Sequence, residues 1–246
     1  SEGSAKTPTA SPSGGIRMGA APIRIPPDGE GQPGCDTVRR MPPIRDEETL
    51  RAILGGDPQP LVVAKVADRL TGLSRQFIER SPFVCLATST PEGDCDVSPR
   101  GDPAGFVRIL DDRTILLPER PGNRLADSLR NILRNPHVGL LFLVPGVGDT
   151  FRVNGRATIV DDEELLAPCA VRGKAPRIGI LVEIEQCYTQ CSKALIRSEL
   201  WNPEHHIERS ELPSFGEILR SLGRDVDPDR YERERAARYA REEGLY

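Results

Sequence analysis

The side chains best suited to bind a ligand surround a turn rich in proline and glycine near the middle of the sequence. Asn123 and Arg124 follow Pro121-Gly122 and precede an apolar pattern with helical spacing. Asparagine is a favourable N-cap, and the free N–H groups of a first helical turn attract anions, to which Arg124 adds a full charge. The pattern predicts a phosphate site at the start of a helix. The alternative is an ordinary capped helix with a surface arginine.

Cysteines are the second group of reactive side chains. The six are Cys35, Cys85, Cys95, Cys169, Cys187 and Cys191. A chain of this length without a secretory signal gives no indication of a disulfide framework, so reduced thiols are expected. Cys187 and Cys191 stand four apart and His205 and His206 follow, but the spacing lacks the paired CxxC pattern of structural zinc sites. We therefore expect no metal.

The composition limits the classes of function. The 246 residues carry a formal charge of −4 and no dense stripe of lysine and arginine. Nucleic-acid binding is disfavoured, because the phosphate backbone requires concentrated positive charge. No apolar run approaches the ~20 residues that span a bilayer. We expect a soluble, cytoplasmic protein without a nucleic-acid or membrane partner.

Three regions are predicted from the patterning. Residues 1–45 are rich in Ser, Pro and Gly and lack a hydrophobic pattern, so a disordered N-terminal tail is expected. Residues 46–205 form the predicted domain. Residues 206–246 form a helical extension with helices over 215–222 and 228–243.

The predicted domain is mainly β with flanking helices. It begins with helices over 47–54 and 62–80, the second weakened in its middle by Gly72. Six β-prone segments, joined mostly by short polar turns, favour a six-stranded antiparallel barrel over a parallel sheet. These segments are 82–90, 95–102, 106–110, 114–117, 138–144 and 150–160. Later elements are a short helix over 163–171, a buried strand over 178–184 and a helical segment over 191–201.

Three runs in this order resemble the pyridoxamine 5′-phosphate oxidase-like family of FMN-binding split barrels. They are PFVCLATSTPEGDCDVSPRGD, LLPERPGNRLADSLRNILRNPHVGLLF and DTFRVNGRATIV, and the later VEIEQCYTQCSKALIRSELW resembles an uncharacterised branch of that family. The resemblance covers roughly residues 46–203. It implies a six-stranded split β-barrel and a homodimer with FMN in a groove at the subunit interface.

The resemblance also implies which residues hold the cofactor. Arg100 takes the place of a basic strand residue near the FMN phosphate or ribityl chain, with Ser98 as an extra hydroxyl donor. Asn123 and Arg124 occupy the small-polar-then-arginine position at the phosphate, where an arginine fork suits the anion. Thr150 stands where classical members place a glutamine against the flavin ring.

The later run supplies further candidates. Lys193 and Arg197 lie four apart on one predicted helical face, with Trp201 a turn further along, and the resemblance places a cation near the flavin edge that gains negative charge on reduction. Lys193 and Arg197 are thus the catalytic candidates and, with Trp201, cofactor-binding candidates. Alternatively, Trp201 packs while both cations are solvated.

Some family features are missing from the sequence. Leu125 replaces a second basic residue, Leu117 and Pro118 replace a Tyr-Thr pair, and no Arg-x-His segment follows near the end of the sequence. Vitamin B6 oxidation is therefore disfavoured. The resemblance implies an FMN-dependent oxidoreductase that transfers hydride between NADH or NADPH and a small organic acceptor or oxygen. The alternatives are a non-catalytic flavin-binding or storage protein and a split barrel that uses F420 or haem.

Overall fold

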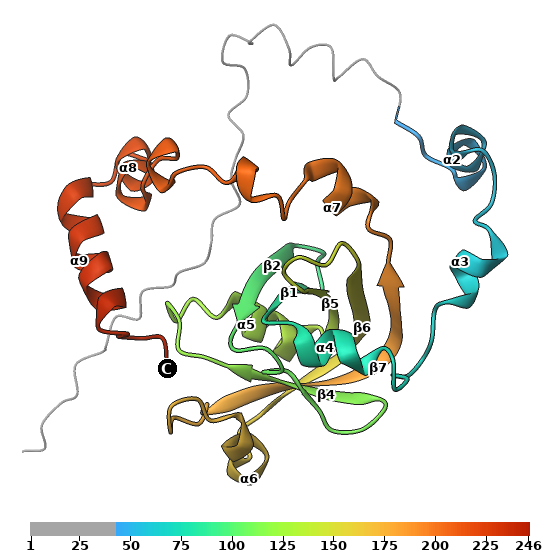
Figure 1. Ribbon diagram of the computed structural model, residues 1–246, viewed down its shortest axis with the longest axis horizontal. Coiled ribbons are helices and arrows are strands. Elements are labelled where there is room, and N and C mark those ends of the chain that lie inside the picture. The colour runs from blue at the N-terminus through green and yellow to red at the C-terminus, as the bar shows by residue number, and fades with distance from the viewer. Residues whose placement is uncertain (1–42) are drawn as a thin grey trace, which may run out of the picture. The chain divides into compact units, whose positions relative to one another are not determined.

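The computed structural model of the protein describes residues 43–246 (Figure 1), which belong to two compact units whose boundary in the sequence lies between Asp57 and Pro58. The prediction of a tail over residues 1–45 therefore falls almost entirely outside the described residues. The described part of the first unit contains one helix, α2 (Glu47–Leu54), which confirms the helix predicted there.

The ends of α2 follow from local chemistry. The Asp46 carboxylate accepts a hydrogen bond from the Thr49 N–H at 2.7 Å and caps the first turn. Gly55 ends the helix in the left-handed conformation, with φ of 86°.

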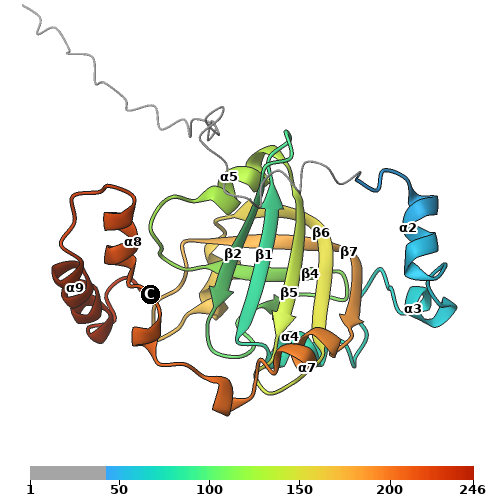
Figure 2. The same ribbon diagram turned by 90° about the horizontal axis from the view of Figure 1, so that it is seen from above.

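A seven-stranded antiparallel sheet forms the centre of the second unit (Figure 2). Its order is β2-β1-β5-β6-β7-β4-β3, and β4 runs across the direction of β1 and β5. The strands are β1 (Phe83–Ser89), β2 (Cys95–Gly101), β3 (Arg108–Ile109), β4 (Thr114–Glu119), β5 (His137–Leu143), β6 (Thr150–Val160) and β7 (Ile178–Gln190).

The predicted antiparallel β architecture is confirmed, but the strand number of six is wrong. β7 pairs with β6 along one side and with β4 along the other, so it is an integral seventh strand. It continues to Gln190, six residues beyond the predicted end. Within residues 43–246 no pairing joins β2 to β3, and the sheet is not closed.

β6 and β7 connect the two parts of the sheet, which are β2-β1-β5 on one side and β4-β3 on the other. They pair from Thr150↔Gln190 to Val160↔Gly179, with a register shift at Asn154/Gly155. A Cβ atom on Gly155 would lie 2.0 Å from the carbonyl oxygen of Glu183. The two backbones can therefore approach this closely because residue 155 is glycine.

Alternate strand residues point into one core. Val84 and Leu86 on β1 are fully buried between half-exposed neighbours, as expected for a strand with one face on the core. The Phe77 ring stacks on Phe151 with centroids 5.6 Å apart. Other fully buried core side chains are Ile78, Ile115, Leu117, Leu140, Phe142, Val153 and Ile180.

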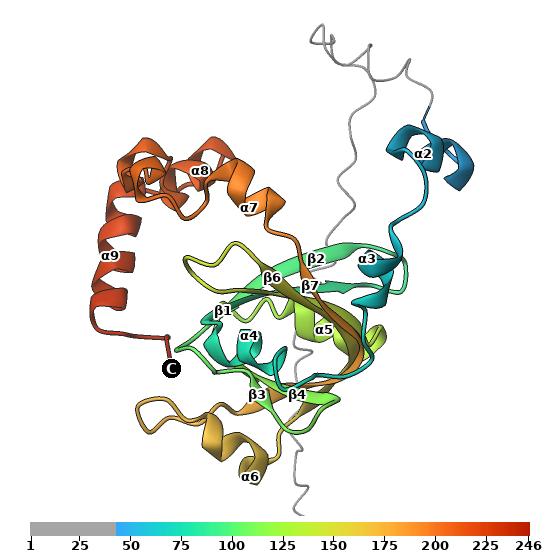
Figure 3. The same cartoon turned by 45° about the vertical axis from the view of Figure 1, so that its right-hand side comes forward.

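The second unit also contains helices. They are α3 (Pro60–Ala64), α4 (Arg75–Arg80), α5 (Asp127–Arg134), α6 (Glu163–Leu166), α7 (Lys193–Ser198), α8 (Phe215–Ser221) and α9 (Pro228–Ala240), with 3-10 turns over Ala167–Cys169, Pro203–His205 and Arg209–Glu211. Helix α4 contacts β3, β5 and β6 (Figure 3), whereas α5 lies against β1, β2 and β6. The helices predicted over 215–222 and 228–243 are confirmed as α8 and α9.

The long helix predicted over 62–80 is wrong. The chain forms α3 and α4 instead, and the segment between them runs alongside β7 and the turn between β3 and β4. Ala67 exchanges two backbone hydrogen bonds with Cys187, of 3.0 and 2.7 Å, and the Leu70 N–H donates to the Asp112 carbonyl at 2.7 Å. These tertiary hydrogen bonds, together with Gly72, outweigh the helical pattern of the sequence.

Candidate functional site

Two ion pairs join parts of the chain that are not paired in the sheet. β2 is one edge of the sheet and β4 lies next to the other edge. Arg100 on β2 donates to Glu119 on β4 at 3.0 Å, and Arg120 donates to Asp102 at 2.6 Å. All four side chains are largely buried, from 1% exposed for Asp102 to 19% for Glu119. The pairs therefore hold the two parts of the open sheet together beside a cavity.

A cavity of about 420 Å³ is lined in part by Arg100, Glu119 and Arg120 of these ion pairs. It is lined by Asp96, Ser98, Arg100, Glu119, Arg120, Gly122, Asn123, Arg124, Leu125, Ala126, Asp127, Ser128 and Leu129. Four predicted site residues thus come together here, two from β2 and two from the loop before α5: Ser98, Arg100, Asn123 and Arg124. Their role in cofactor binding stays a prediction.

Strand periodicity brings the β2 residues to the cavity. Asp96, Ser98 and Arg100 alternate with more exposed residues, so they share one face of the strand. The Arg100 Nη1 donates to Ser98 Oγ at 2.6 Å and to the Pro99 carbonyl at 3.1 Å. Its Nη2 has no partner among residues 43–246 and is free to donate to a ligand.

The loop before α5 differs from the prediction. Asn123 does not cap the helix: its Oδ1 accepts from the Leu125 N–H at 3.0 Å, and α5 begins at Asp127 after Ala126. Arg124 and Ala126 both have left-handed backbones, with φ of 64° and 56°. Such conformations cost about 1–2 kcal/mol each in residues other than glycine and cluster where a loop is shaped for binding. Residues 127–129, which form the first turn of α5 and have no helical partner for their N–H groups, nevertheless line the cavity.

The cavity is electrically balanced. Arg100, Arg120 and Arg124 line it together with the three carboxylates of Asp96, Glu119 and Asp127. Most of these charges have a partner: Asp96, for example, accepts a hydrogen bond from Ser128 Oγ at 2.8 Å. Arg124 is exposed and has no ion-pair or hydrogen-bond partner among the described residues. It is the cation in this cavity most accessible to an incoming anion.

A second cavity, of about 320 Å³, is lined in part by the same ion-paired side chains. It shares Arg100, Glu119, Arg120 and Gly122 with the first cavity and is also lined by Phe106, Pro121 and residues 244–246. The Tyr246 hydroxyl donates to Asp102 at 3.2 Å, and the Arg120 guanidinium lies 5.5 Å from the centroid of the Tyr246 ring. The segment after α9 therefore forms one wall of this cavity.

Asp102, Glu119 and Arg120 were not among the residues predicted from the sequence. Glu119 and Arg120 end the buried run Ile115–Pro118. Charged residues that directly continue a buried strand are the signal that could have identified them, because charges near a core are paired or bind ligands. The partner of each was not predictable, since β2 and β4 meet through the tertiary fold.

Four other predicted site residues do not line the first cavity. Thr150 is buried at the start of β6, and Lys193 and Arg197 are exposed on α7. The helix predicted over 191–201 ends at Ser198, because Glu199 adopts a left-handed backbone with φ of 48°. Trp201 lies beyond it and donates its indole N–H to the Val147 carbonyl at 2.9 Å. Thr150 begins β6, α7 follows the end of β7, and none of the four residues is in the lining of the first cavity.

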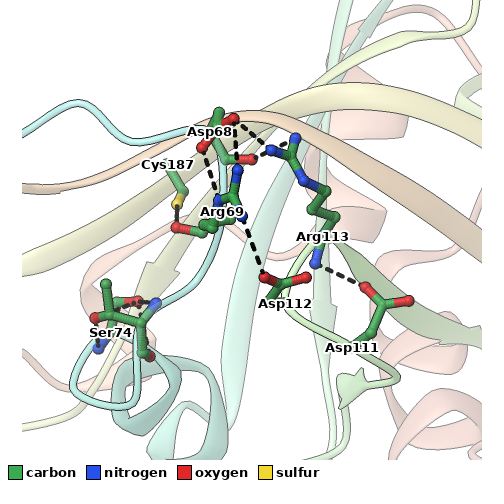
Figure 4. A network of polar contacts seen from close by, with 8 residues as sticks. Asp68, Arg69, Ser74, Asp111, Asp112, Arg113 and Cys187 are labelled. Atoms are coloured by element: carbon green, nitrogen blue, oxygen red, sulfur yellow. Dashed lines mark hydrogen bonds and ion pairs between the residues drawn. The ribbon is translucent and has the colours of Figure 1, made fainter.

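A second polar cluster holds the segment between α3 and α4 in place (Figure 4). Asp68 receives hydrogen bonds from Arg69 and from Arg113, and these lower the pKa of its carboxyl group to about 2. Arg69 also lies 3.9 Å from Asp112. The Cys187 thiol donates to the Arg69 carbonyl at 3.2 Å, and burial raises its pKa. Because the charges neutralise each other, this cluster is an anchor for the segment.

Two classes of site find no support in the described part of the chain. Among residues 43–246 there is no group of three or more His, Cys, Asp or Glu side chains placed to hold a metal ion. Within the same residues, every helix is too short or too polar to cross a bilayer.

These observations define a class of protein that has an open antiparallel sheet and a charged cavity between the two parts of that sheet. The sequence profile of the family described as "Pyridoxamine 5′-phosphate oxidase" matches residues 70–191, which include every strand and both cavity-lining segments from 96 to 129. This part of the chain therefore belongs to the pyridoxamine 5′-phosphate oxidase-like family. No curated protein matches the chain.

Several solved structures resemble part of this chain. HupZ from Group A Streptococcus is 19% identical over 50% of this chain and 95% of its own, with a TM-score of 0.42. General Stress Protein 26 from Bacillus anthracis is 18% identical over 47% of this chain and 88% of its own (TM-score 0.35). An F420 reductase is 20% identical over 46% and 94% (TM-score 0.36). These similarities are too low to assign a ligand or a reaction.

Proposed function

We propose that the protein is an FMN-dependent oxidoreductase. The observation that carries the proposal is the convergence of Ser98 and Arg100 with Asn123 and Arg124 around one cavity, within the segment that belongs to the pyridoxamine 5′-phosphate oxidase-like family. Arginine forks and unpaired N–H groups at a helix start are the donors that a phosphate requires.

The cavity fits a flavin phosphate in size and chemistry. Its volume of about 420 Å³ falls in the range of small-molecule sites. Arg100 Nη2, the Arg124 guanidinium and the first-turn N–H groups of α5 are free to donate to phosphate oxygens. Leu125, 58% exposed, supplies an apolar contact in place of a second cation.

The protein's own residues would bind and orient the cofactor. FMN, when bound, would supply the chemistry by accepting a hydride and passing the electrons on. Arg100 and Arg124 would hold the phosphate end. Lys193 and Arg197 would place positive charge near the flavin ring and stabilise the charge that develops on reduction. Since no residue of α7 lines the cavity, we propose that these cations, with Thr150 and Trp201, come from the second subunit of a homodimer.

The proposed reaction is hydride transfer from NADH or NADPH to a small organic acceptor or oxygen. A non-catalytic flavin-binding or storage protein remains the alternative in which the same cavity holds FMN without turnover. Haem is less well supported, since no histidine or cysteine of the described chain lines the cavity. F420 would need the same phosphate donors, so the binding experiment below distinguishes it from FMN.

The test is a visible absorption spectrum of the purified protein before and after incubation with FMN and passage through a desalting column. We expect retained flavin bands, and bleaching of these bands when NADH or NADPH is added without oxygen. Retained flavin that neither nucleotide reduces would favour the storage alternative. Protein that stays colourless after incubation would contradict FMN binding, and the same column assay with F420 or haem would then identify the cofactor.

A further inference from the structure

The Arg100 guanidinium has a carboxylate partner inside the proposed phosphate site. Glu119 Oε2 accepts from Arg100 Nε at 3.0 Å, and the two side chains are 19% and 16% exposed. The pair joins β2 to β4 across the unpaired part of the sheet. No other ion pair of the described chain involves either residue.

A carboxylate in this position opposes the binding of an anion. Glu119 lines the same cavity as Arg100 and Arg124, so its negative charge repels a phosphate placed between them. Glu119 and Arg100 are shielded from water, and the effective dielectric constant around them is lower than in water. The repulsion between the Glu119 carboxylate and a bound phosphate is therefore strong. A dianionic phosphate must therefore either tolerate this charge or take its place.

We propose that Glu119 is an internal counter-ion that a phosphate group displaces from Arg100, and that it thereby limits the affinity of the site for ligands that carry a phosphate. The proposal rests on the proposed binding of FMN. Displacement is sterically feasible because Glu119 also lines the second cavity, into which its side chain can turn. Arg100 stays held by Ser98 and by the Pro99 carbonyl, so it keeps its place on β2 when the carboxylate leaves.

A ligand without a phosphate gains nothing from this exchange. The phosphate of FMN replaces the lost ion pair with charge-assisted hydrogen bonds to Arg100, whereas riboflavin has no anion that could do so. The carboxylate therefore lowers the affinity of ligands that carry a phosphate monoester and leaves the affinity of ligands without a phosphate unchanged.

The test compares FMN and riboflavin binding to the wild-type chain and to Glu119→Gln by flavin fluorescence titration. Glutamine has nearly the same shape and still accepts a hydrogen bond from Arg100, but it carries no charge. We expect FMN to bind about tenfold more tightly and riboflavin to bind unchanged. Glu119→Ala, which removes the competitor altogether, should tighten FMN binding as well.

Two controls separate displacement from a general charge effect. Asp127→Asn removes a carboxylate that lines the same cavity but pairs with Arg130, at 3.6 Å, and should change FMN affinity far less. In an Arg100→Gln background, Glu119→Gln should no longer tighten FMN binding, because the two changes act through one contact.

Several outcomes would overturn the inference. Equal tightening by Asp127→Asn, equal tightening for riboflavin, or unchanged FMN affinity in both Glu119 variants would each contradict displacement while leaving FMN binding itself intact. Failure of both the wild-type chain and Glu119→Gln to retain FMN would contradict the proposed function, and the inference with it.

Discussion

At the scale of single residues, the first cavity combines cations that are already paired with one that is not. Arg100 and Arg120 are held by Glu119 and Asp102, whereas Arg124 is exposed on a loop with no partner in the described chain. A paired arginine can position a ligand with little loss of side-chain entropy, whereas a free arginine offers its full charge. The two kinds of arginine should therefore contribute to phosphate binding in different ways.

Arg124→Ala should weaken FMN binding by about 1.5–3 kcal/mol, the loss expected for a charge-assisted contact to phosphate. Alanine keeps a Cβ atom, so the backbone strain at φ of 64° is retained and the loss reflects the side chain. The measurement is the dissociation constant from flavin fluorescence.

Arg134→Ala is the matched control for this variant. Arg134 is an exposed arginine on α5 that does not line the cavity and pairs with Glu92, which does not line it either, so its removal should leave FMN binding unchanged. Equal effects of the two variants would show that only net charge matters and would remove Arg124 from the site.

At the scale of elements, the geometry of the sheet depends on the close approach of β6 and β7. Gly155→Ala would place a Cβ atom 2.0 Å from the Glu183 carbonyl oxygen, a backbone atom that cannot rotate away. We expect the free energy of unfolding to fall by about 3 kcal/mol, as measured by urea denaturation.

Gly139→Ala provides a matched comparison. Gly139 pairs with Asn154 on β6, and its nearest contact to an added Cβ atom would be an ordinary 3.5 Å to the Asn154 side chain. This variant should be neutral or stabilised by up to about 1 kcal/mol through the unfolded state. If the two glycine variants lose stability equally, the bulge at Gly155 does not constrain the sheet.

The anchor of the segment between α3 and α4 should depend on pH. Hydrogen bonds from Arg69 and then Arg113 lower the pKa of Asp68 to about 2, below its ordinary value of 3.8. A carboxyl group whose pKa is lowered by folding stabilises the fold above its unfolded pKa, and this stabilisation is lost as the pH falls from about 4 towards 2.

Asp68→Asn is the variant that tests this contribution. It should be less stable than the wild-type chain at pH 7, and the difference in unfolding free energy between the two should shrink as the pH is lowered through this window. Urea titrations at several pH values measure it. A difference that stays constant from pH 7 to pH 2.5 would show that the Asp68 ion pairs do not stabilise the fold.

At the scale of the whole molecule, the proposed site needs two subunits. Light scattering after gel filtration should give twice the 27.0 kDa mass of the chain. A monomer that binds FMN tightly would contradict the contribution of Lys193 and Arg197 from a second subunit.

A mixing experiment tests the shared site directly. When Arg124→Ala and Arg197→Ala chains are refolded together, each mixed dimer should contain one site with both defects and one with neither. About a quarter of all sites should then regain wild-type FMN affinity. No recovery would indicate that both arginines serve the same subunit's site, whereas wild-type FMN affinity of the Arg197→Ala chain on its own would show that Arg197 serves none.

Local patterns in the amino-acid sequence determine much of the fold. The alternation in β1 and the hairpin to β2 were predictable, because side-chain period and turn residues act within a few positions. The caps of α2 follow from Asp46 and Gly55 for the same reason. The family resemblance likewise pointed to Ser98, Arg100, Asn123 and Arg124, which the fold brings around one cavity.

What only the tertiary structure decided depends on contacts between distant parts of the sequence. Residues 65–74 leave the helical pattern because they find hydrogen-bond partners on β7 and in the β3-β4 turn. Asn123 does not cap the helix, because its side chain accepts a hydrogen bond from the Leu125 N–H within the loop that lines the cavity. The partnership of Arg100 with Glu119 arises because an open sheet brings its two parts together, and no local pattern encodes which charge will stand opposite which.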